Sequence, residues 1–357
     1  MADIKLRVGV VGLGEIAQIS HMPFLQELPY FEIGAICDLS PTVLEKIGEK
    51  YSVYERYTDF QDMVKQDDLD IVLVTNKNHA PPSIAALNEG KHVLVEKPIA
   101  FNLKQADDMI QAAKSNKKKL MVGFMKRYDP AFQKMKEMMP EVEKIQLIRV
   151  HEFAGTYLIN REIYDLVKAS DLDPDVLADV IKQDQADILA DIGPDRTDLL
   201  DAHDIMIHLC IHDINALHGL YGLPEDIICA QLFDSNFVTA LMEYENGVQI
   251  TWESGNLVSL VDWDEQITVF GSNMSLELKF PFPYLKYAAT ILNIRENENG
   301  SASRRQIVAS YDEAFKREWR HFYDCIVNDK QPMTSAEEAR EDLAFAVELT
   351  KKAADIK

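Results

Sequence analysis

Two histidines lie one helical turn apart in the segment MIHLCIHDINALH, residues 206–218. On a helix, His208, His212 and Asn215 fall in one column at the edge of the apolar face, so these side chains can line a pocket. Imidazoles at this spacing could bind a metal ion, move a proton, or lie as satisfied polar groups at a core boundary. The zinc-protease pattern requires a glutamate at position 209, which is Leu here, so we expect proton handling and no metal.

A second candidate for chemistry is the glycine-containing stretch RVGVVGLGEIA. Gly12, Gly14 and Ala17 form a G-x-G-x-x-A pattern between an apolar strand and a helix, where backbone can approach a pyrophosphate at the helix N-terminus. The next apolar run ends in Asp38, which can accept hydrogen bonds from the adenine-ribose hydroxyls. A carboxylate there disfavours the 2′-phosphate of NADP, so the pattern predicts NAD as cofactor. The alternative is an ordinary turn followed by a solvent-exposed Asp.

The third candidate is Lys97 in HVLVEKPIA, which follows a strand that is apolar through Val95. Ligands of open α/β sheets bind at the carboxyl ends of the strands. A lysine there can donate a hydrogen bond to a substrate oxygen. The alternative is a surface loop in which Glu96 and Lys97 form an exposed ion pair.

The surrounding pattern predicts the elements that position these residues. Up to about residue 126, short β-branched runs alternate with helix-length segments, which is typical of a doubly wound parallel sheet. Residues 127–357 contain longer alternating strands with turn signals, which indicate an α+β domain with an open, mostly antiparallel sheet. An acidic helical insertion is expected at about 160–204, as a solvated face or a lid. The chain from Tyr311 onward reads as helical, with an N-cap at Thr334 or Ser335.

Composition narrows the class of protein. The 357 residues carry a net charge of −22 and are 47% apolar, which argues against a nucleic-acid partner and provides for a large core. Because no apolar run is long enough to span a bilayer and no leader pattern is present, we expect a cytoplasmic protein without membrane contact. The four cysteines form no C-x-x-C pair, which indicates buried thiols rather than disulfides.

Four motifs in this order resemble the Gfo/Idh/MocA family of oxidoreductases, which includes inositol dehydrogenases and glucose–fructose oxidoreductases. They are the glycine loop, HVLVEKP, GFMKRYDP at 123–130, and IHDINALHGLYGLP at 211–224. The resemblance covers nearly the whole chain. It implies a Rossmann domain, a nicotinamide cofactor, a sugar or polyol substrate, and homodimers or homotetramers formed through the open sheet.

The resemblance also implies roles for individual residues. Lys97 matches the lysine that contacts the reacting oxygen, and His212 matches the acid/base histidine. Arg127, Tyr128, His208 and Asn215 are expected at the substrate. The residues expected to contact the cofactor all belong to the glycine loop or to ends of the following strands: Gly12, Gly14, Glu15, Ile16, Ala17, Asp38, Thr75, Asn76, Asn78, His79, Glu96 and Lys97.

The chain departs from the family pattern at two positions on this helix. Many members resemble D-x-x-x-H-x-x-D, whereas this sequence has His208 and Asn215 in place of the two aspartates. A neutral imidazole cannot offer the two oxygens of a carboxylate to neighbouring hydroxyls, so the identity of the substrate stays open. Because the family includes a regulator and redox-cycling glycosidases, a non-catalytic NAD-binding regulator and an NAD-dependent glycosidase are the alternatives to a dehydrogenase.

Overall fold

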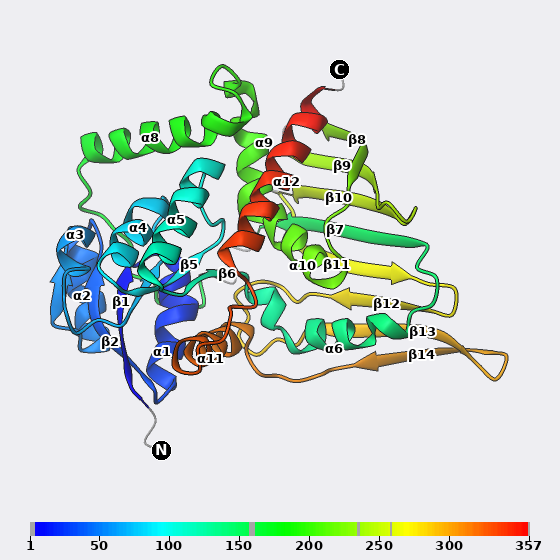
Figure 1. The fold of residues 1–357 in the computed structure, drawn as a ribbon, viewed down its shortest axis with the longest axis horizontal. Helices are drawn as coiled ribbons and strands as arrows, with labels where there is room; N and C mark the ends of the chain where they lie inside the picture. The colour runs from blue at the N-terminus through cyan, green and yellow to red at the C-terminus, as the bar shows by residue number, and fades with distance from the viewer. Residues whose placement is uncertain (1–3, 157–160, 234–235, 258, 356–357) are drawn as a thin grey trace. The chain divides into compact units, whose positions relative to one another are not determined.

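A computed structural model describes residues 4–156, 161–233, 236–257 and 259–355. The chain divides into two compact units. The first unit comprises residues 1–124, 164–194 and 318–341, and the second comprises 125–163, 195–317 and 342–357. Figure 1 shows the elements of both units. In the part of the chain that the structure describes, we find no helix long and apolar enough to cross a membrane.

The first unit is built on a parallel sheet in the order β3-β2-β1-β4-β5-β6. Its direction of winding reverses between β1 and β4, which is the switch point where doubly wound sheets bind ligands. Strands β4, β5 and β6 are almost wholly buried, which explains why they read as continuous apolar runs. The strands are β1 (Leu6–Val11), β2 (Phe31–Cys37), β3 (Glu55–Tyr57), β4 (Ile71–Val74), β5 (His92–Glu96) and β6 (Leu120–Gly123).

Helices connect these strands and complete the first unit. Several begin with a side-chain cap; for example, Ser40 accepts a hydrogen bond from the amide of Val43 at the start of α2. The helices are η1 (Ala17–His21), a π-helix, and α1 (Met22–Glu27), α2 (Pro41–Tyr51), α3 (Phe60–Met63), α4 (Ala80–Asn88), α5 (Leu103–Asn116) and α8 (Pro174–Ile192). Parts of α11 (Ala314–Val327) and α12 (Ala336–Asp355) also belong to this unit.

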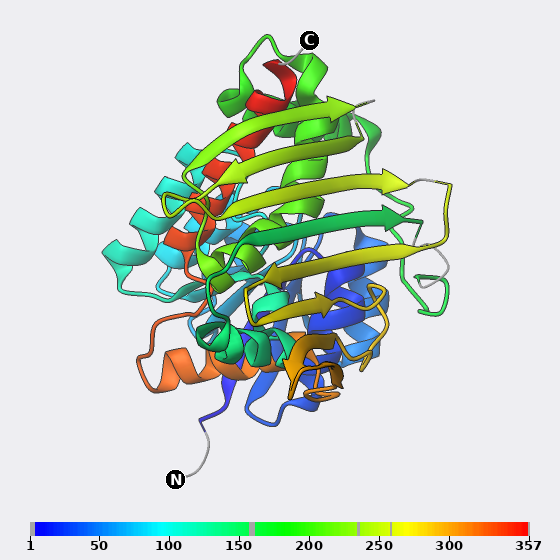
Figure 2. The same cartoon turned by 90° about the vertical axis from the view of Figure 1, so that its right-hand side faces the viewer.

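The second unit is built on a sheet in the order β14-β13-β12-β11-β7-β10-β9-β8, seen face-on in Figure 2. Neighbouring strands are antiparallel except β7 and β10, which run parallel. The strands are β7 (Leu147–Gly155), β8 (Asp226–Phe233), β9 (Phe237–Glu243), β10 (Gln249–Leu257), β11 (Trp263–Phe270), β12 (Met274–Lys279), β13 (Ile291–Glu298) and β14 (Ser301–Ile307).

Alternation along these strands separates a buried face from a more polar one. In β10, Ile250 and Trp252 are buried while Thr251 and Glu253 are partly exposed. The same unit contributes short helices and α10, which carries the histidine motif. These are η2 (Met125–Tyr128), α6 (Pro130–Met138), η3 (Met139–Glu141), η4 (Thr197–Leu199), α9 (Leu200–Ile205), η5 (Met206–Cys210) and α10 (Ile211–Tyr221).

The predicted fold class is confirmed, and several details differ from the sequence prediction. Strand β3 was not expected, because three residues at a sheet edge give almost no periodic signal. The acidic insertion does form a helix, α8, but residues 164–194 belong to the first unit and not to the second. Its expected first residue, Asn160, lies outside the described residues. Ser335 caps α12 by accepting a hydrogen bond from the amide of Glu338, as the sequence indicates.

Candidate functional site

The glycine loop joins β1 to the first helix of the parallel sheet. Gly12 has a φ of +86°, and a Cβ there would lie 2.4 Å from the backbone nitrogen of Asn76, so only glycine fits. Gly14 is exposed, and a Cβ there would meet no atom within 4 Å. The residues that follow, Glu15, Ile16 and Ala17, begin the helical segment. The loop therefore leaves open space beside a helix N-terminus, which fits a pyrophosphate.

Asp38 is held at the end of β2 by two backbone amides. Its Oδ2 accepts a hydrogen bond from the amide of Leu13 at 2.8 Å, and its Oδ1 accepts one from the amide of Ser40 at 2.9 Å. These bonds connect the carboxylate directly to the glycine loop. The structure thus brings together the two features that sequence reasoning assigned to the dinucleotide, in an arrangement that fits an adenine ribose.

The segment after β4 lies against the same loop. The hydroxyl of Thr75 donates to the carbonyl of Gly12 at 2.6 Å, and the side-chain amide of Asn76 donates to the carbonyl of Asn78 at 2.7 Å. The buried imidazole of His79 lies with Nδ1 2.6 Å from the carbonyl of Pro98, just past Lys97. Since a carbonyl only accepts, Nδ1 of His79 carries a proton.

Glu96 and Lys97 end β5, and a buried network holds Glu96. Its Oε1 lies 2.7 Å from Nε2 of His21, and Nδ1 of His21 lies 3.1 Å from the indole nitrogen of Trp319. An indole N–H only donates, so Nδ1 of His21 accepts and Nε2 carries the proton that is donated to Glu96. His21 is therefore the neutral Nε2–H tautomer, next to the residue that precedes Lys97.

Opposing effects act on the pKa of Glu96. Burial alone would raise it, but the hydrogen bond from His21 and the nearby positive charges, including Lys97, leave the pKa below its ordinary value. Glu318 of α11 is fully buried near Glu96, and burial, followed by the charge of Glu96, raises the pKa of Glu318 well above its ordinary value. These directions favour the ionised form of Glu96 and the protonated form of Glu318.

The histidine motif lies in the second unit and begins in a π-helix rather than in a regular α-helix. His208 belongs to η5, residues 206–210, and His212 is the second residue of α10. Nδ1 of His208 lies 3.1 Å from the carbonyl oxygen and 3.3 Å from the carboxylate of Asp204. Both contacts join residues four apart, about one helical turn, and π-helical segments are frequent at functional sites.

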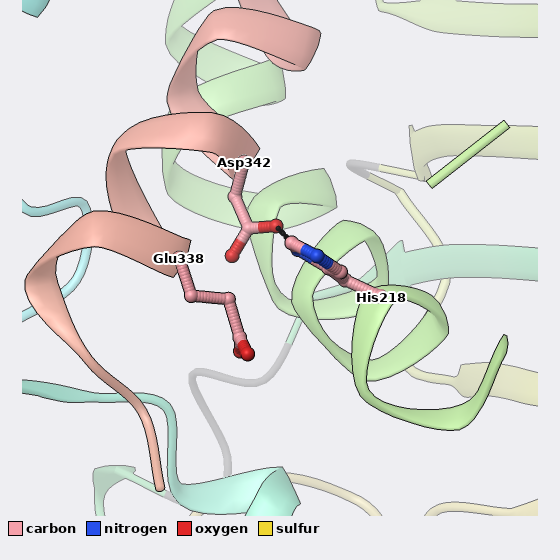
Figure 3. Close-up of side chains that lie close together, drawn as sticks. All are labelled: His218, Glu338 and Asp342. Carbon is pink, nitrogen blue, oxygen red and sulfur yellow. Dashed lines mark hydrogen bonds and ion pairs between the residues drawn. The ribbon is translucent and has the colours of Figure 1, made fainter. Parts of the chain in front are cut away.

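Asn215 and His218 of α10 both contact the buried carboxylate of Asp342 on α12, and Figure 3 shows the contact of His218. The side-chain amide of Asn215 donates to Oδ2 of Asp342 at 2.7 Å, and Nδ1 of His218 lies 2.8 Å from Oδ1. Glu338 lies one turn before Asp342 on the same helix. Both oxygens of Asp342 therefore accept a hydrogen bond from a side chain of α10.

Arg127 and Tyr128 of η2 are buried at 2% and 3% exposure. Nη1 of Arg127 donates to the backbone carbonyl of Asn215 at 3.2 Å. A Cβ on Gly219 would lie 2.2 Å from the guanidinium carbon, so this glycine permits the guanidinium to lie against α10. Within the second unit, Arg127 thus fixes the helix that carries His212, and its expected contact with substrate stays a prediction.

Sequence reasoning did not find a buried ionic cluster around Lys126. Its ammonium contacts Oε1 of Glu265, and lies 3.5 Å from Asp213 and 3.9 Å from Glu152. Burial raises the pKa of Asp213, although Lys126 and a hydrogen bond with Glu152 act in the opposite direction. The available signal was the strand phase, because Glu152 follows Ile148 and Val150 on the buried face of β7. The other missed residues are His21, Trp319 and Glu318, for which no local pattern exists.

The fold and the glycine loop define a dinucleotide-binding protein of the Rossmann class. Residues 6–124 match the model of the family GFO_IDH_MocA, described as an oxidoreductase family with an NAD-binding Rossmann fold. This match agrees with the resemblance seen in the motifs over residues 6–124.

Curated relatives match the same part of the chain. Inositol 2-dehydrogenase of Salmonella typhimurium is 31% identical over 152 residues, which cover 42% of this chain and 45% of that protein. Myo-inositol 2-dehydrogenase of Thermotoga maritima is 35% identical over 134 residues, covering 37% of this chain and 40% of that protein. The matched part of this chain therefore spans less than half the length of each of these curated relatives.

Solved structures share the fold over the whole chain. An aldose–aldose oxidoreductase from Caulobacter crescentus aligns with a TM-score of 0.75 and 21% identity, covering 99% of this chain and 98% of that chain. A 3-ketoreductase from Actinomadura kijaniata in complex with NADP aligns with a TM-score of 0.74 and 18% identity, covering 98% and 97%. At these identities the alignments support the fold.

Proposed function

We propose that this protein is an oxidoreductase that transfers a hydride between NAD(H) and a carbinol carbon of a sugar, inositol or related polyol. The observation that carries the proposal is the joined glycine loop and Asp38 at the switch point, with Lys97 at the end of β5 on the same edge of the sheet. The inositol dehydrogenases among the relatives support the substrate class.

In this proposal each polar residue has a defined task. His212 removes the hydroxyl proton in the oxidative direction and returns it in the reductive direction. Lys97 donates a hydrogen bond to the oxygen on which negative charge develops. His208, Arg127, Tyr128 and Asn215 orient the substrate. When NAD is bound, its nicotinamide supplies the hydride acceptor.

The cofactor residues of the first unit complete the assignment. The backbone at Gly12, Gly14, Glu15, Ile16 and Ala17 would hold the pyrophosphate, and Asp38 would hold the adenine ribose. The ends of β4 and β5 would border the nicotinamide through Thr75, Asn76, Asn78, His79 and Glu96. NADP is the less favoured cofactor because Asp38 would repel its 2′-phosphate.

A panel of polyols and sugars, assayed for NADH formation, tests this function. Turnover of a polyol that is lost in Lys97→Met but kept in Lys104→Met, an exposed lysine on α5, would support it. Release of sugar without net NADH would favour the NAD-dependent glycosidase. Tight NAD binding with no turnover of any compound would favour the non-catalytic regulator.

We further propose that the protein works in the cytoplasm as a homodimer or homotetramer formed through the open sheet of the second unit. Figure 2 shows this sheet face-on. Its exposed polar residues include Arg149 of β7 and Glu253 of β10, which pair at 3.3 Å. Light scattering coupled to size-exclusion chromatography measures the assembly. A monomer at micromolar concentration would contradict this part of the proposal.

A further inference from the structure

The segment before α8 is tied to the cofactor edge of the first unit. The side-chain amide of Gln18, just past the glycine loop, exchanges two hydrogen bonds with the backbone of Val167, both at 2.9 Å. Further along, Asp187 of α8 accepts hydrogen bonds from Asn78, which follows β4, and from Gln105 of α5, and Figure 1 shows α8 near α4 and α5. The acidic insertion therefore has defined contacts around the strand ends.

Asp171 in this segment is bound at the N-terminus of α2. Its carboxylate accepts hydrogen bonds from the hydroxyl of Ser40, from the amide of Thr42 at 2.8 Å, and from the hydroxyl of Thr42 at 2.6 Å. The hydrogen bonds from Ser40 and then Thr42 lower the pKa of Asp171 to about 2. A carboxylate of the chain itself thus occupies an anion position at this helix end.

The position matters because Ser40 also links to Asp38. The amide of Ser40 donates to Asp38, and its hydroxyl donates to Asp171, so two carboxylates lie on either side of one residue. In this class of fold the residue at the end of β2 receives the ribose 2′-hydroxyl of NAD. A 2′-phosphate would extend from that hydroxyl toward the neighbouring donors of Ser40 and Thr42. In this protein those donors are already bound to Asp171.

We propose that Asp171 is a specificity-determining residue that excludes the 2′-phosphate of NADP. It does so in two ways, by occupying the hydroxyl and amide donors that a phosphate would need, and by adding a second negative charge beside Asp38. This inference rests on the proposed NAD(H)-dependent function. It also means that replacing Asp38 alone leaves part of the selectivity in place.

The test is the affinity of Asp171→Ala for NAD and for NADP, measured by isothermal titration calorimetry. NADP binding should tighten by roughly ten- to a hundredfold, the order expected for hydrogen bonds to a charged group, while NAD binding changes by less than about threefold. Asp179→Ala, which removes an exposed acid of α8, is the matched control and should change neither affinity. The gain for NADP should shrink as salt is added, since part of it is electrostatic.

Two outcomes would overturn the proposal. Equal gains for both cofactors would show that the segment only covers the site, and no gain for NADP would show that Asp171 does not face the phosphate. Because the measurement needs no turnover, it is separate from the polyol panel. A selectivity change without polyol oxidation would contradict the proposed reaction alone, and polyol oxidation without a selectivity change would contradict the role of Asp171 alone.

Discussion

Replacing Lys126 with methionine should strongly destabilise the second unit. The ammonium lies among the carboxylates of Glu152, Asp213 and Glu265, and the side chains of all four residues are at most 7% exposed. Methionine keeps most of the volume of lysine but removes the positive charge. Three carboxylates would then share a buried space without a cation.

The magnitude follows from the cost of leaving buried charge uncompensated. Removing one partner of a buried ion pair costs about 3–5 kcal/mol, and we expect Lys126→Met to lie in this range at neutral pH. Burial already raises the pKa of Asp213, and loss of the Lys126 charge should raise it further. Between the ordinary pKa and this raised pKa the folded state binds more protons than the unfolded state, so the loss should shrink as pH falls, by at most about 1.4 kcal/mol per pH unit for that proton.

Urea unfolding followed by tryptophan fluorescence measures this effect at several pH values. The indole of Trp263 donates to Glu265 at 2.9 Å, so its emission reports on the cluster directly. Lys134→Met is the matched control, because Lys134 pairs with Glu137 at the surface and should cost only about 0–1 kcal/mol. An equal loss in both variants, or a loss in Lys126→Met that does not depend on pH, would refute the reasoning.

Three further outcomes are expected. Glu318→Gln should flatten the decline of the free energy of unfolding with rising pH. The raised pKa of Glu318 favours its protonated form in the folded state, while the unfolded side chain releases its proton above its ordinary pKa of 4.5. Identical pH slopes of the two proteins in urea unfolding would contradict this. Nitrogen-15 NMR of His21 should show a proton on Nε2 and none on Nδ1, because Nδ1 accepts a hydrogen bond from the indole of Trp319; a proton on Nδ1 would contradict this tautomer. His212→Ala should lower kcat with a polyol by about 10²–10⁴-fold while NAD affinity stays the same. A loss of NAD affinity as large as the loss of kcat would instead indicate that His212 binds the cofactor.

The parts of the site that sequence predicts are those with a local signal. Gly12 needs a positive φ and close backbone approach, and Asp38 follows a buried strand at a fixed distance, so both can be found within one βαβ unit. The edge strand β3 and the π-helix that contains His208 have no such signal. A π-helix of five residues is too short to change the apolar pattern recognisably, so the sequence predicted a regular helix.

Long-range partners could not be predicted from one sequence. Trp319 and His21 are 298 positions apart and meet because residues 318–341 belong to the first unit. The acidic insertion was expected to be a solvated face or a lid, since runs of Asp are usually exposed. Its contacts depend on donors at Ser40 and Asn78 that are common loop residues and reveal nothing about their partners.

The acidic composition and the binding of an anionic dinucleotide are reconciled by where the carboxylates lie. Asp38 accepts two backbone amides, Asp171 accepts two hydroxyls and an amide, and Asp191 accepts the amide of Leu103 at the start of α5. Each of these carboxylates accepts hydrogen bonds from protein donors, which partly compensate its charge. The backbone amides of the glycine loop lie at a helix N-terminus with open space beside Gly14, so an anion can bind there although the chain as a whole is strongly negative. For the same reason, selection against the 2′-phosphate of NADP depends on individual side chains such as Asp38 and Asp171 and not on the net charge of the protein.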